Sequence, residues 1–480
     1  MVVFGGTGDL THRKLVPALY NLHLTGQLPE DFSLVGVGRK LKENAQYRAE
    51  LAASVEEFSA ATYDDQRWAD FAVKLYYYAG DLHDAESYPG LKDALKTGAC
   101  DSGNDGNYLF YLAVAPQLFA SIAGNLSRFG LANAKKGWRR IMIEKPFGYN
   151  LASAGELNAA LAAVFDEKNI YRIDHYLGKE MLQNILVIRF ANEVFEPLWN
   201  NHFIDNIQFN TLESEGIGQR GRYYDRAGAL RDMFQSHLLQ MLAITAMEPP
   251  AENCPPSIRL EKLRLLSSVQ LWPDGDPGDN LAFGQYKGFR DEIDIAPDSQ
   301  TETFVAVRLA VNNARWQGVP FYLRSGKKLS DKQAKIVIQF KKPPGLFARE
   351  RLADLSGERG ELLNLLTLKV QPSEGVVFQF NIKKPGTTGE IAPVEMDFCQ
   401  PCAFMINSPE AYERLLADAM IGDTARFTSW DEVEKAWSLT DKIYAEYKRS
   451  GQLVNDYAPG ETGPPAAEEM LSRRGHRWWN

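Results

Sequence analysis

The chain has 480 residues, of which 45% are apolar and 24% charged, and its formal net charge is −9. This length exceeds what one hydrophobic core normally supports, so at least two domains are expected. The negative charge argues against a general surface for nucleic acid or anionic membrane. No apolar run approaches the roughly 18 residues of a membrane span, and the N-terminus lacks the pattern of a signal peptide. Because the chain has only four cysteines, a cytosolic protein is expected.

The first third of the chain alternates short β-rich runs with amphipathic helical stretches. The expected strands lie at 1–4, 32–38, 74–80, 107–114 and 139–145. Regular alternation of strand and helix predicts a parallel sheet with right-handed crossovers, and so an α/β, Rossmann-like dinucleotide-binding domain over residues 1–174. Ligands of such sheets bind at the carboxyl ends of the strands.

Beyond about residue 175 the pattern changes to alternation with period two. Apolar residues share one face in three segments, 304–311, 335–340 and 375–383. This pattern predicts an α+β domain over 175–480, built on a large, mainly antiparallel sheet with one buried face. Helices near 228–247 and 408–421 are expected to cover that face. The segment 343–360 is expected to be a long loop, because it is rich in charge, glycine and proline.

GGTGDL at 5–10 follows the first apolar run directly. Strand, glycine turn and helix in that order let backbone N–H groups approach a phosphate at a helix N-terminus. The spacing Gly5-x-x-Gly8-x-x-Thr11 is a variant of the dinucleotide fingerprint without its third glycine. A tight turn that binds nothing is the alternative. The residues expected to contact a dinucleotide here are Gly5, Gly6, Thr7, Gly8, Asp9 and Leu10.

The second expected strand ends in Arg39 and Lys40. NAD-specific domains place an Asp or Glu there, which accepts from the ribose 2′-hydroxyl. A guanidinium instead pairs with a 2′-phosphate through charge-assisted hydrogen bonds. The sequence therefore predicts NADP rather than NAD, with two solvated cations as the alternative.

Residues 171–180, YRIDHYLGKE, place an acid, a histidine, a phenol and a lysine close together where the parallel sheet is expected to end. If 175–179 form a helical turn, His175 and Lys179 share a face, and with Tyr176 they make an anion clamp. The alternative is a domain junction held by ordinary hydrogen bonds.

His237 lies on the apolar stripe of a helix expected over 230–241. A lone histidine in that setting is more often a core residue. It acts as a general base only if a carboxylate orients the imidazole, and Asp174 is the candidate for that role.

Two further segments carry polar chemistry. YLRSGKKLSDK at 322–332 is rich in cations and forms either a solvated loop or a contact for an anionic substrate. Cys399 and Cys402 form a CxxC, but no second pair or histidine follows at the spacing of zinc ligands. They are interpreted as two incidental thiols, and no metal is expected.

Together these segments resemble the glucose-6-phosphate dehydrogenase family over almost the full length. The segments that carry the resemblance are GGTGDLTHRKL near the start, EKPFG at 144–148, RIDHYLGKE at 172–180, RYYDRAGALRDMFQSHLLQ at 222–240, YLRSGKKL at 322–329, VQPSEG at 370–375 and KKPG at 383–386. DHYLGKE is highly specific to this family, whereas EKP also occurs in other Rossmann-type sugar oxidoreductases.

The resemblance implies oxidation of glucose 6-phosphate at its anomeric carbon to 6-phosphoglucono-1,5-lactone, with NADP as hydride acceptor, as the first step of the oxidative pentose phosphate pathway. It implies that His237 is the general base, that Asp174 pairs with it and that Pro146 is cis. The implied substrate contacts are Lys145, His175, Tyr176, Lys179, Glu213, Asp232, Lys327 and Lys332, the last being arginine in some relatives. The implied coenzyme contacts are Lys14, Arg39, Asp81, Leu82 and Lys145.

Two other functions are compatible with parts of this pattern. One is a Rossmann-type oxidoreductase acting on an unphosphorylated sugar, against which the His175, Tyr176 and Lys179 clamp argues. The other is a non-catalytic NADP-sensing protein, which would have no reason to retain Asp174 with His237. A homodimer or homotetramer is expected, because an antiparallel sheet with a free face commonly forms such an interface.

Overall fold

The computed structural model describes residues 1–97, 106–133, 136–342, 363–387, 390–399, 411–451 and 454–480. The chain divides into two compact units. Unit 1 comprises Met1–Gly178, Glu252–Arg259 and Pro409–Glu434, and unit 2 comprises Lys179–Ala251, Leu260–Ser408 and Lys435–Asn480. No helix within the described part of the chain is long and apolar enough to cross a bilayer. The loop expected at 343–360 lies outside the described residues.

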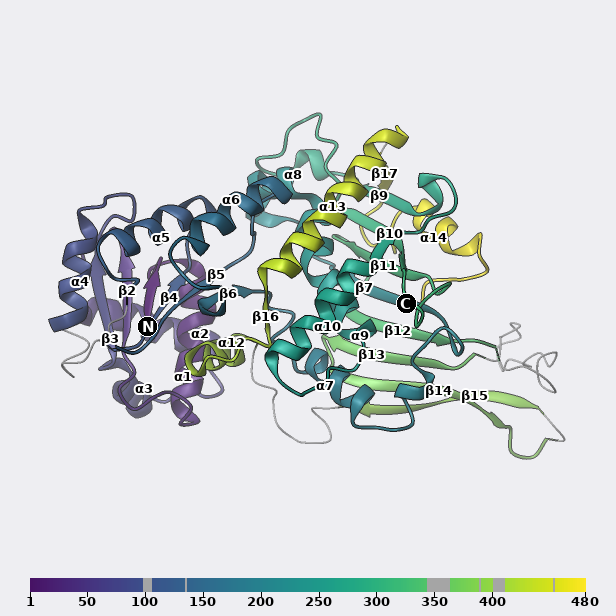
Figure 1. The fold of residues 1–480 in the computed structure, drawn as a ribbon, viewed down its shortest axis with the longest axis horizontal. Helices are drawn as coiled ribbons and strands as arrows, with labels where there is room; N and C mark the ends of the chain where they lie inside the picture. The colour runs from purple at the N-terminus through teal and green to yellow at the C-terminus, as the bar shows by residue number, and fades with distance from the viewer. Residues whose placement is uncertain (98–105, 134–135, 343–362, 388–389, 400–410, 452–453) are drawn as a thin grey trace. The chain divides into compact units, whose positions relative to one another are not determined.

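Unit 1 is built on a seven-stranded sheet (Figure 1). Its strands, in spatial order, are β16 (Phe427–Thr428), β6 (Ile170–Ile173), β5 (Arg139–Ile143), β4 (Tyr108–Leu112), β1 (Val2–Phe4), β2 (Leu34–Gly38) and β3 (Leu75–Ala79). All neighbouring pairs are parallel except β16 with β6. The order from β3 to β6 is that of a doubly wound dinucleotide-binding fold. The five strands expected in this part of the sequence are confirmed.

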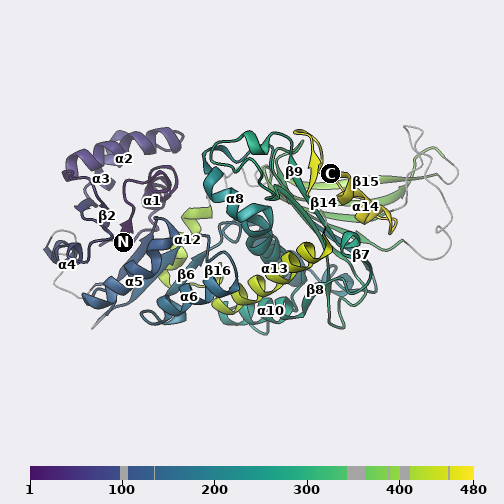
Figure 2. The ribbon, with the colours of Figure 1, turned by 90° about the horizontal axis from the view of Figure 1, so that it is seen from above.

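Helices cover both faces of this sheet (Figure 2). On one face lie η1 (Thr11–Leu15), α1 (Val16–Leu24), α2 (Asn44–Phe58), α3 (Asp65–Ala72) and α12 (Ala411–Ile421), and on the other α4 (Ser87–Thr97), α5 (Phe119–Arg128) and α6 (Leu151–Ala162). Val3 joins the first core with Leu19 of α1, whereas the adjacent Phe4 stacks on Tyr88 of α4 with ring centroids 6.4 Å apart. β1 therefore buries side chains on both faces, as is typical of a strand inside a parallel sheet.

The position of α12 differs from the sequence expectation. The helix near 408–421 was expected on the large antiparallel sheet, but its described part, α12, lies in unit 1. Its buried Leu415 and Leu416 join the core that contains Leu19. At its end the Arg140 side chain donates to the carbonyl of Ala419 at 2.7 Å. The amphipathic pattern predicts the helix correctly, but it does not say which of two apolar surfaces the helix covers.

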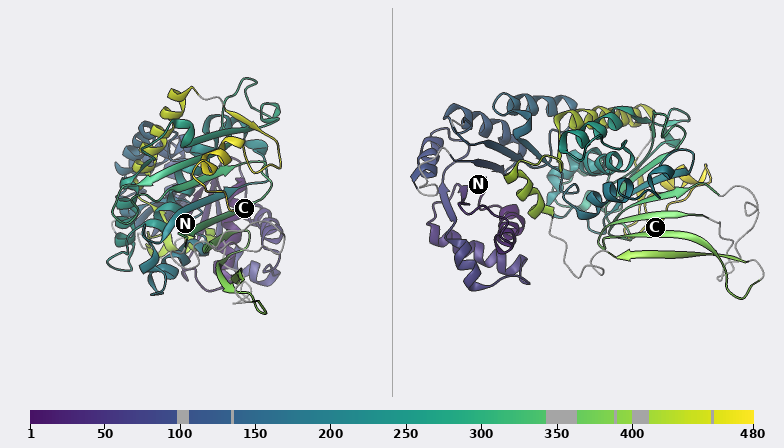
Figure 3. Two further views of the ribbon diagram at one scale, coloured as in Figure 1. Left: turned by 90° about the vertical axis from the view of Figure 1, so that its right-hand side faces the viewer. Right: turned by 60° about the horizontal axis from the view of Figure 1, so that its bottom comes forward.

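Unit 2 contains a ten-stranded sheet, whose strands β13 to β15 are light green in Figure 3. Along it lie β15 (Ile391–Cys399), β14 (Gly375–Lys383), β13 (Leu365–Gln371), β12 (Gln333–Phe340), β7 (Ile204–Leu212), β11 (Phe321–Gly326), β10 (Phe304–Val311), β9 (Leu281–Tyr286) and β17 (Asn455–Tyr457), with β8 (Val269–Leu271) paired to β10. The pairs are antiparallel except β7 with β11 and β9 with β17. The three expected strands and the mainly antiparallel sheet are confirmed.

The central strands of this sheet are buried on both faces, so the expectation of one buried face is wrong for them. On one face η6 (Leu230–Leu238) packs against β7, β10 and β11, which confirms the helix expected near 228–247. On the other, α14 (Pro465–Ser472) and the C-terminal residues cover polar side chains. The Gln208 side chain of β7 donates to the carbonyl of Arg477 at 2.9 Å and accepts from the backbone N–H of Trp479 at 3.1 Å.

Cys399, the last residue of β15, is disulfide-bonded. The interpretation of this cysteine as an incidental thiol is therefore wrong. Cys254 is a free thiol, and Cys402, the other cysteine of the CxxC, lies outside the described residues.

Candidate active site

The glycine turn after β1 brings the backbone into very close contact with its neighbours. Gly5 has φ of 89°, and the N–H groups of Gly5 and Gly6 both donate to the Val37 carbonyl, at 3.0 and 2.9 Å. A Cβ on Gly5 would lie 2.2 Å from the Ala113 carbonyl oxygen, and one on Gly6 would lie 2.6 Å from the Gly36 Cα. Only glycine fits this cradle, which leads directly into the helix that begins at Asp9. A phosphate can approach such a backbone closely.

Thr11 stands where the usual fingerprint has its third glycine. The residue is fully buried, and its hydroxyl donates to the Gly5 carbonyl at 2.9 Å. The Thr11 side chain therefore holds the two ends of the turn together. A glycine at this position could not make that bond, which accounts for the departure from the glycine spacing.

Tyr47 of α2 stabilises the glycine turn through a hydrogen bond. Its hydroxyl donates to the Gly6 carbonyl at 2.9 Å, and a Cβ on Gly36 would lie 2.2 Å from that hydroxyl oxygen. Burial raises the pKa of Tyr47, so its phenol stays protonated and remains a donor. Nothing in the sequence pattern singled out this residue.

Replacing Tyr47 with phenylalanine should raise the KM for NADP while leaving kcat almost unchanged. The lost hydrogen bond to Gly6 is worth about 1 kcal/mol, or roughly fivefold in KM. Steady-state kinetics with varied NADP measure the effect, and Tyr63→Phe, which removes an exposed hydroxyl bonded to Asp65, is the control. A lower kcat at saturating NADP would contradict a role confined to the coenzyme turn.

The carboxyl ends of β1, β2 and β3 lie side by side, because these strands are neighbours and parallel. The exposed Arg39 and Lys40 follow β2, and the Lys40 carbonyl accepts from the Tyr77 hydroxyl at 2.7 Å. Asp81 and the buried Leu82 follow β3. The sheet thus brings the glycine turn, Arg39, and Asp81 with Leu82 together at the carboxyl ends of its strands. Lys14 lies on η1 and Asp9 pairs with Arg13 at 3.7 Å.

Replacing Arg39 with alanine should raise the KM for NADP at least tenfold, because a charge-assisted hydrogen bond is worth roughly 1.5–3 kcal/mol. The KM for NAD, which lacks the 2′-phosphate, should barely change. Steady-state kinetics with both coenzymes measure the ratio, and Arg67→Ala, an exposed arginine of α3, is the control. Equal effects on NADP and NAD would exclude the assignment of Arg39 to the phosphate.

The carboxyl ends of β5 and β6 carry the next set of polar residues in unit 1. The Lys145–Pro146 peptide bond is cis, as the resemblance implied. Before it, Glu144 accepts hydrogen bonds from the hydroxyls of Tyr111 and Tyr412, the latter at 3.0 Å. Burial raises the pKa of Glu144, an effect that the two phenols partly offset. The EKPFG motif contained Glu144, but no local signal pointed to its two tyrosine partners.

Residues 175–178 form a turn after β6 and the next helix begins only at Glu180, so the helical turn considered for 175–179 is wrong. The Asp174 carboxylate accepts from the Tyr176 N–H at 3.0 Å, and this local bond favours a turn over a helix. Asp174 and Tyr176 are buried and His175 is exposed. Lys179 is extended, with φ −75° and ψ 134°, and precedes α7 (Glu180–Phe190). His175 and Lys179 therefore do not share a helical face.

In unit 2, β7 and β11 are parallel neighbours and end together, with Leu212 opposite Gly326. The next residues are Glu213 and Lys327, whose side chains form an ion pair. Lys327 is only 3% exposed. Beyond it Lys332 pairs with Glu215 at 2.7 Å, both exposed. The cation-rich segment is thus partly a buried, ordered site and partly a solvated loop.

Asp232 and His237 lie on η6, a π-helix, and are 5% and 2% exposed. The Asp232 carboxylate accepts from the Tyr223 hydroxyl at 3.2 Å. Short π-helical segments occur often at functional sites, and this one changes the α-helical spacing from which the apolar stripe was inferred. Because η6 contacts β7 and β11, it lies beside the two strands that Glu213 and Lys327 directly follow. The pairing of His237 with Asp174 of unit 1 stays a prediction.

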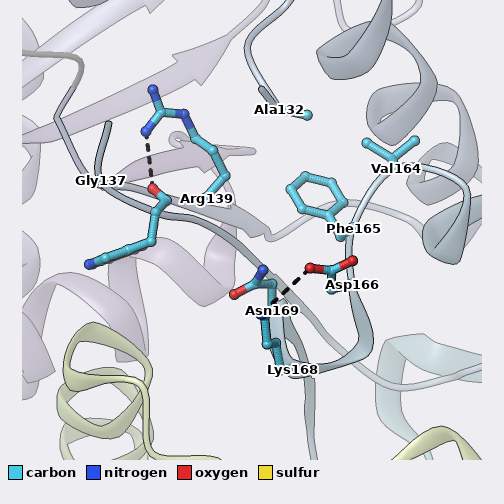
Figure 4. A pocket seen from close by; sticks show the side chains of 9 residues that line it. Ala132, Gly137, Arg139, Val164, Phe165, Asp166, Lys168 and Asn169 are labelled. Carbon is cyan, nitrogen blue, oxygen red and sulfur yellow. Dashed lines mark hydrogen bonds and ion pairs between the residues drawn. The ribbon is translucent and has the colours of Figure 1, made fainter. Parts of the chain in front are cut away.

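A pocket of about 360 Å³ lies at the amino ends of strands of the unit 1 sheet, opposite to the carboxyl ends described above (Figure 4). Its lining residues are Ala132, Gly137, Trp138, Arg139, Val164, Phe165, Asp166, Lys168 and Asn169. The strands β5 and β6 begin there, whereas ligands of doubly wound sheets bind where the strands end. The Arg139 guanidinium donates to the carbonyls of Leu131 and Trp138, at 3.1 and 3.0 Å. This pocket is therefore not a candidate for the coenzyme.

The glycine cradle on a doubly wound sheet, and the buried histidine with carboxylates and lysines on the second unit, define a dinucleotide-dependent oxidoreductase. The profile of "Glucose-6-phosphate dehydrogenase, NAD binding domain" matches residues 2–184, and that of "Glucose-6-phosphate dehydrogenase, C-terminal domain" matches 186–479. The chain belongs to the glucose-6-phosphate dehydrogenase family.

Individual relatives agree over the full length. Glucose-6-phosphate 1-dehydrogenases of Bacillus subtilis (strain 168) and Chlamydia pneumoniae are each 41% identical to the chain, covering 100% of it and 98% and 95% of the relatives. A glucose-6-phosphate dehydrogenase solved in complex with its substrate glucose-6-phosphate is 32% identical with a TM-score of 0.90, covering 100% of this chain and 98% of that one. The Mycobacterium avium enzyme has a TM-score of 0.83 at 32% identity and the same coverage.

Proposed function

We propose that the protein oxidises D-glucose 6-phosphate at the anomeric carbon to 6-phospho-D-glucono-1,5-lactone with NADP, the first step of the oxidative pentose phosphate pathway. Family membership over the full length carries this proposal. The NADP preference is supported by the exposed Arg39 after β2, where an NAD-specific domain has an acid.

His237 is the proposed general base that takes the proton from the anomeric hydroxyl. Asp174 is proposed to orient its imidazole, to fix the tautomer and to stabilise the imidazolium that forms. NADP, when bound, supplies the acceptor for the hydride that leaves the same carbon. No metal is needed, because a positioned base and a hydride acceptor are sufficient for this oxidation.

The remaining proposed substrate contacts divide by the part of the sugar phosphate that they bind. His175, Tyr176 and Lys179 bind the phosphate, and Glu213 and Asp232 bind sugar hydroxyls. Lys145, Lys327 and Lys332 supply further contacts to the substrate. The Glu213–Lys327 ion pair supports this assignment, because the buried Lys327 holds the Glu213 carboxylate beside the helix that carries Asp232.

The proposed coenzyme contacts are Gly5, Gly6, Thr7, Gly8, Asp9, Leu10, Lys14, Arg39, Asp81, Leu82 and Lys145. Coenzyme binding is assigned to residues 1–174, and substrate binding and dimerisation to 175–480.

A homodimer or homotetramer in the cytoplasm is proposed. Ile382 of β14 and Met396 and Phe398 of β15 are 37%, 63% and 44% exposed. Cross-strand pairing places them on one face of the sheet, since Phe398 lies opposite Val376 and Ile382 opposite Ala392. A contiguous apolar face at the end of a sheet supports a protein interface.

The test follows NADPH absorbance with glucose 6-phosphate, with glucose and with no sugar. Rapid reduction with glucose 6-phosphate alone is the expected result. A preference for glucose would instead favour an oxidoreductase of unphosphorylated sugars. Binding of NADP without reduction by either sugar would favour a non-catalytic sensor.

A further inference from the structure

The helix that carries Asp232 and His237 runs through the interior of unit 2. η6 continues into α9 (Leu239–Ala246), and every residue from 232 to 247 is buried. Burial on all sides keeps water from the helix ends, so the terminal N–H and C=O groups need protein partners. A glutamate supplies partners at one end, and an arginine with two indoles supplies them at the other.

Glu302 holds the N-terminal end. It lies two residues before β10 and is 4% exposed. Its backbone carbonyl accepts from the Ala229 N–H at 2.9 Å, and its Oε1 accepts from the Leu230 N–H at 3.1 Å. Burial raises the pKa of Glu302, and the hydrogen bond from the Leu230 N–H partly offsets that effect.

Gly228 makes this contact possible. It has φ of 66°, a conformation that favours glycine, at the kink before η6. A Cβ on it would lie 2.3 Å from Oε1 and 2.5 Å from Cδ of Glu302. The turn into the helix therefore presses the backbone against the Glu302 carboxyl group, and no larger residue fits.

Arg189 of α7 holds the C-terminal end. It is fully buried, and its Nη1 donates to the carbonyls of Thr245 and Met247, at 3.0 and 2.8 Å. The indoles of Trp199 and Trp316 donate to the carbonyls of Thr245 and Ala246, at 2.8 and 2.7 Å. A guanidinium complements the negative end of the helix dipole.

We propose that Glu302 and Arg189 form a hydrogen-bond clamp that fixes this helix along its axis, and that Glu302 thereby acts as a positioning residue for His237. The inference rests on the proposed function only in giving His237 the role of base. A shift of the helix in either direction would break the bonds at one end. A base displaced by about 1 Å can lose roughly a hundredfold in rate, so the clamp keeps the imidazole at the reacting hydroxyl.

The kinetic test compares Glu302→Gln, which keeps an acceptor oxygen for Leu230, with Glu302→Leu, which does not. Glu302→Leu should lower kcat roughly ten- to a hundredfold, with the KM for NADP little changed. The kinetic isotope effect on kcat, measured with glucose 6-phosphate deuterated at C1, should rise, because hydride transfer from C1 becomes slower than product release. Glu302→Gln should retain most of the activity. The control is Glu261→Leu, a buried glutamate paired with Arg264 on α10 (Pro255–Ser268).

Loss of folded enzyme would lower the apparent kcat of Glu302→Leu with the isotope effect unchanged. That result, or an unchanged kcat, would overturn the positioning role.

The second test uses thermal unfolding and needs no activity. Gly228→Ala should lower the Tm more in the presence of Glu302 than in a Glu302→Ala background, because the smaller side chain removes the clash. Strictly additive shifts would overturn the contact on which the clamp depends. If the wild-type protein failed to oxidise glucose 6-phosphate, the proposed function would fail, while this coupling would still decide whether the clamp exists.

Discussion

Replacing His237 with asparagine is expected to lower kcat by roughly 10²–10⁴, with little change in the KM for glucose 6-phosphate. Asparagine keeps a polar side chain in the buried position on η6 but cannot take a proton. The loss therefore falls on the transition state, in which the anomeric hydroxyl gives up its proton, and not on the binding of the ground state.

Initial rates of NADPH formation at saturating substrate measure this effect. His202→Asn is the matched control, because His202 is an exposed histidine of the same unit and its kinetics should match the wild type. A His237→Asn protein with wild-type kcat and a raised KM would show that the histidine binds substrate and does not act as the base.

The parts of the molecule that were predicted correctly are those in which a local pattern has one physical solution. The turn at Gly5 needs a positive φ and close backbone contact, and glycine is the residue type that meets both requirements. The alternation of strands and helices has the parallel, doubly wound sheet as its solution, since right-handed crossovers leave little choice. The position of Lys327 directly after a strand is also confirmed, whereas its role at the site stays a prediction.

The parts that were not predicted depend on residues distant in sequence. Glu302 lies more than seventy residues after Gly228, and only the fold brings the two into contact. Gln208 is a polar residue on β7, within the sheet that was expected to have only one buried face, and it is buried because the chain around Arg477 returns to cover it. The π-helix is another example, since the spacing of apolar residues over 230–238 fits an α-helix equally well.

The same distinction explains why two tyrosine partners of motif residues were not predicted. Tyr47 and Tyr412 each place one hydroxyl on a residue of a recognisable motif, Gly6 and Glu144 respectively. Neither tyrosine lies in a pattern of its own. Motifs therefore indicated the candidate binding and reacting groups, whereas the side chains that hold those groups in place appeared only with the fold.

Lys179→Ala is expected to raise the KM for glucose 6-phosphate roughly ten- to a hundredfold, because a charge-assisted hydrogen bond to the phosphate contributes about 1.5–3 kcal/mol. The structure places the Lys179 ammonium group on the Gln371 side chain, at the end of β13. This contact holds the lysine extended before α7, so its charge is ordered before substrate binds. kcat should fall less than KM rises, since the phosphate is remote from the reacting carbon.

Glucose distinguishes a phosphate contact from a structural role for Lys179. Without a phosphate, glucose gains nothing from the ammonium group, so kcat/KM for glucose should be nearly the same in Lys179→Ala and wild type. Lys179→Arg, which keeps the charge, should recover part of the affinity for glucose 6-phosphate. A parallel loss with both sugars would mean that Lys179 supports the fold through Gln371, and the phosphate would then have to be bound by other residues.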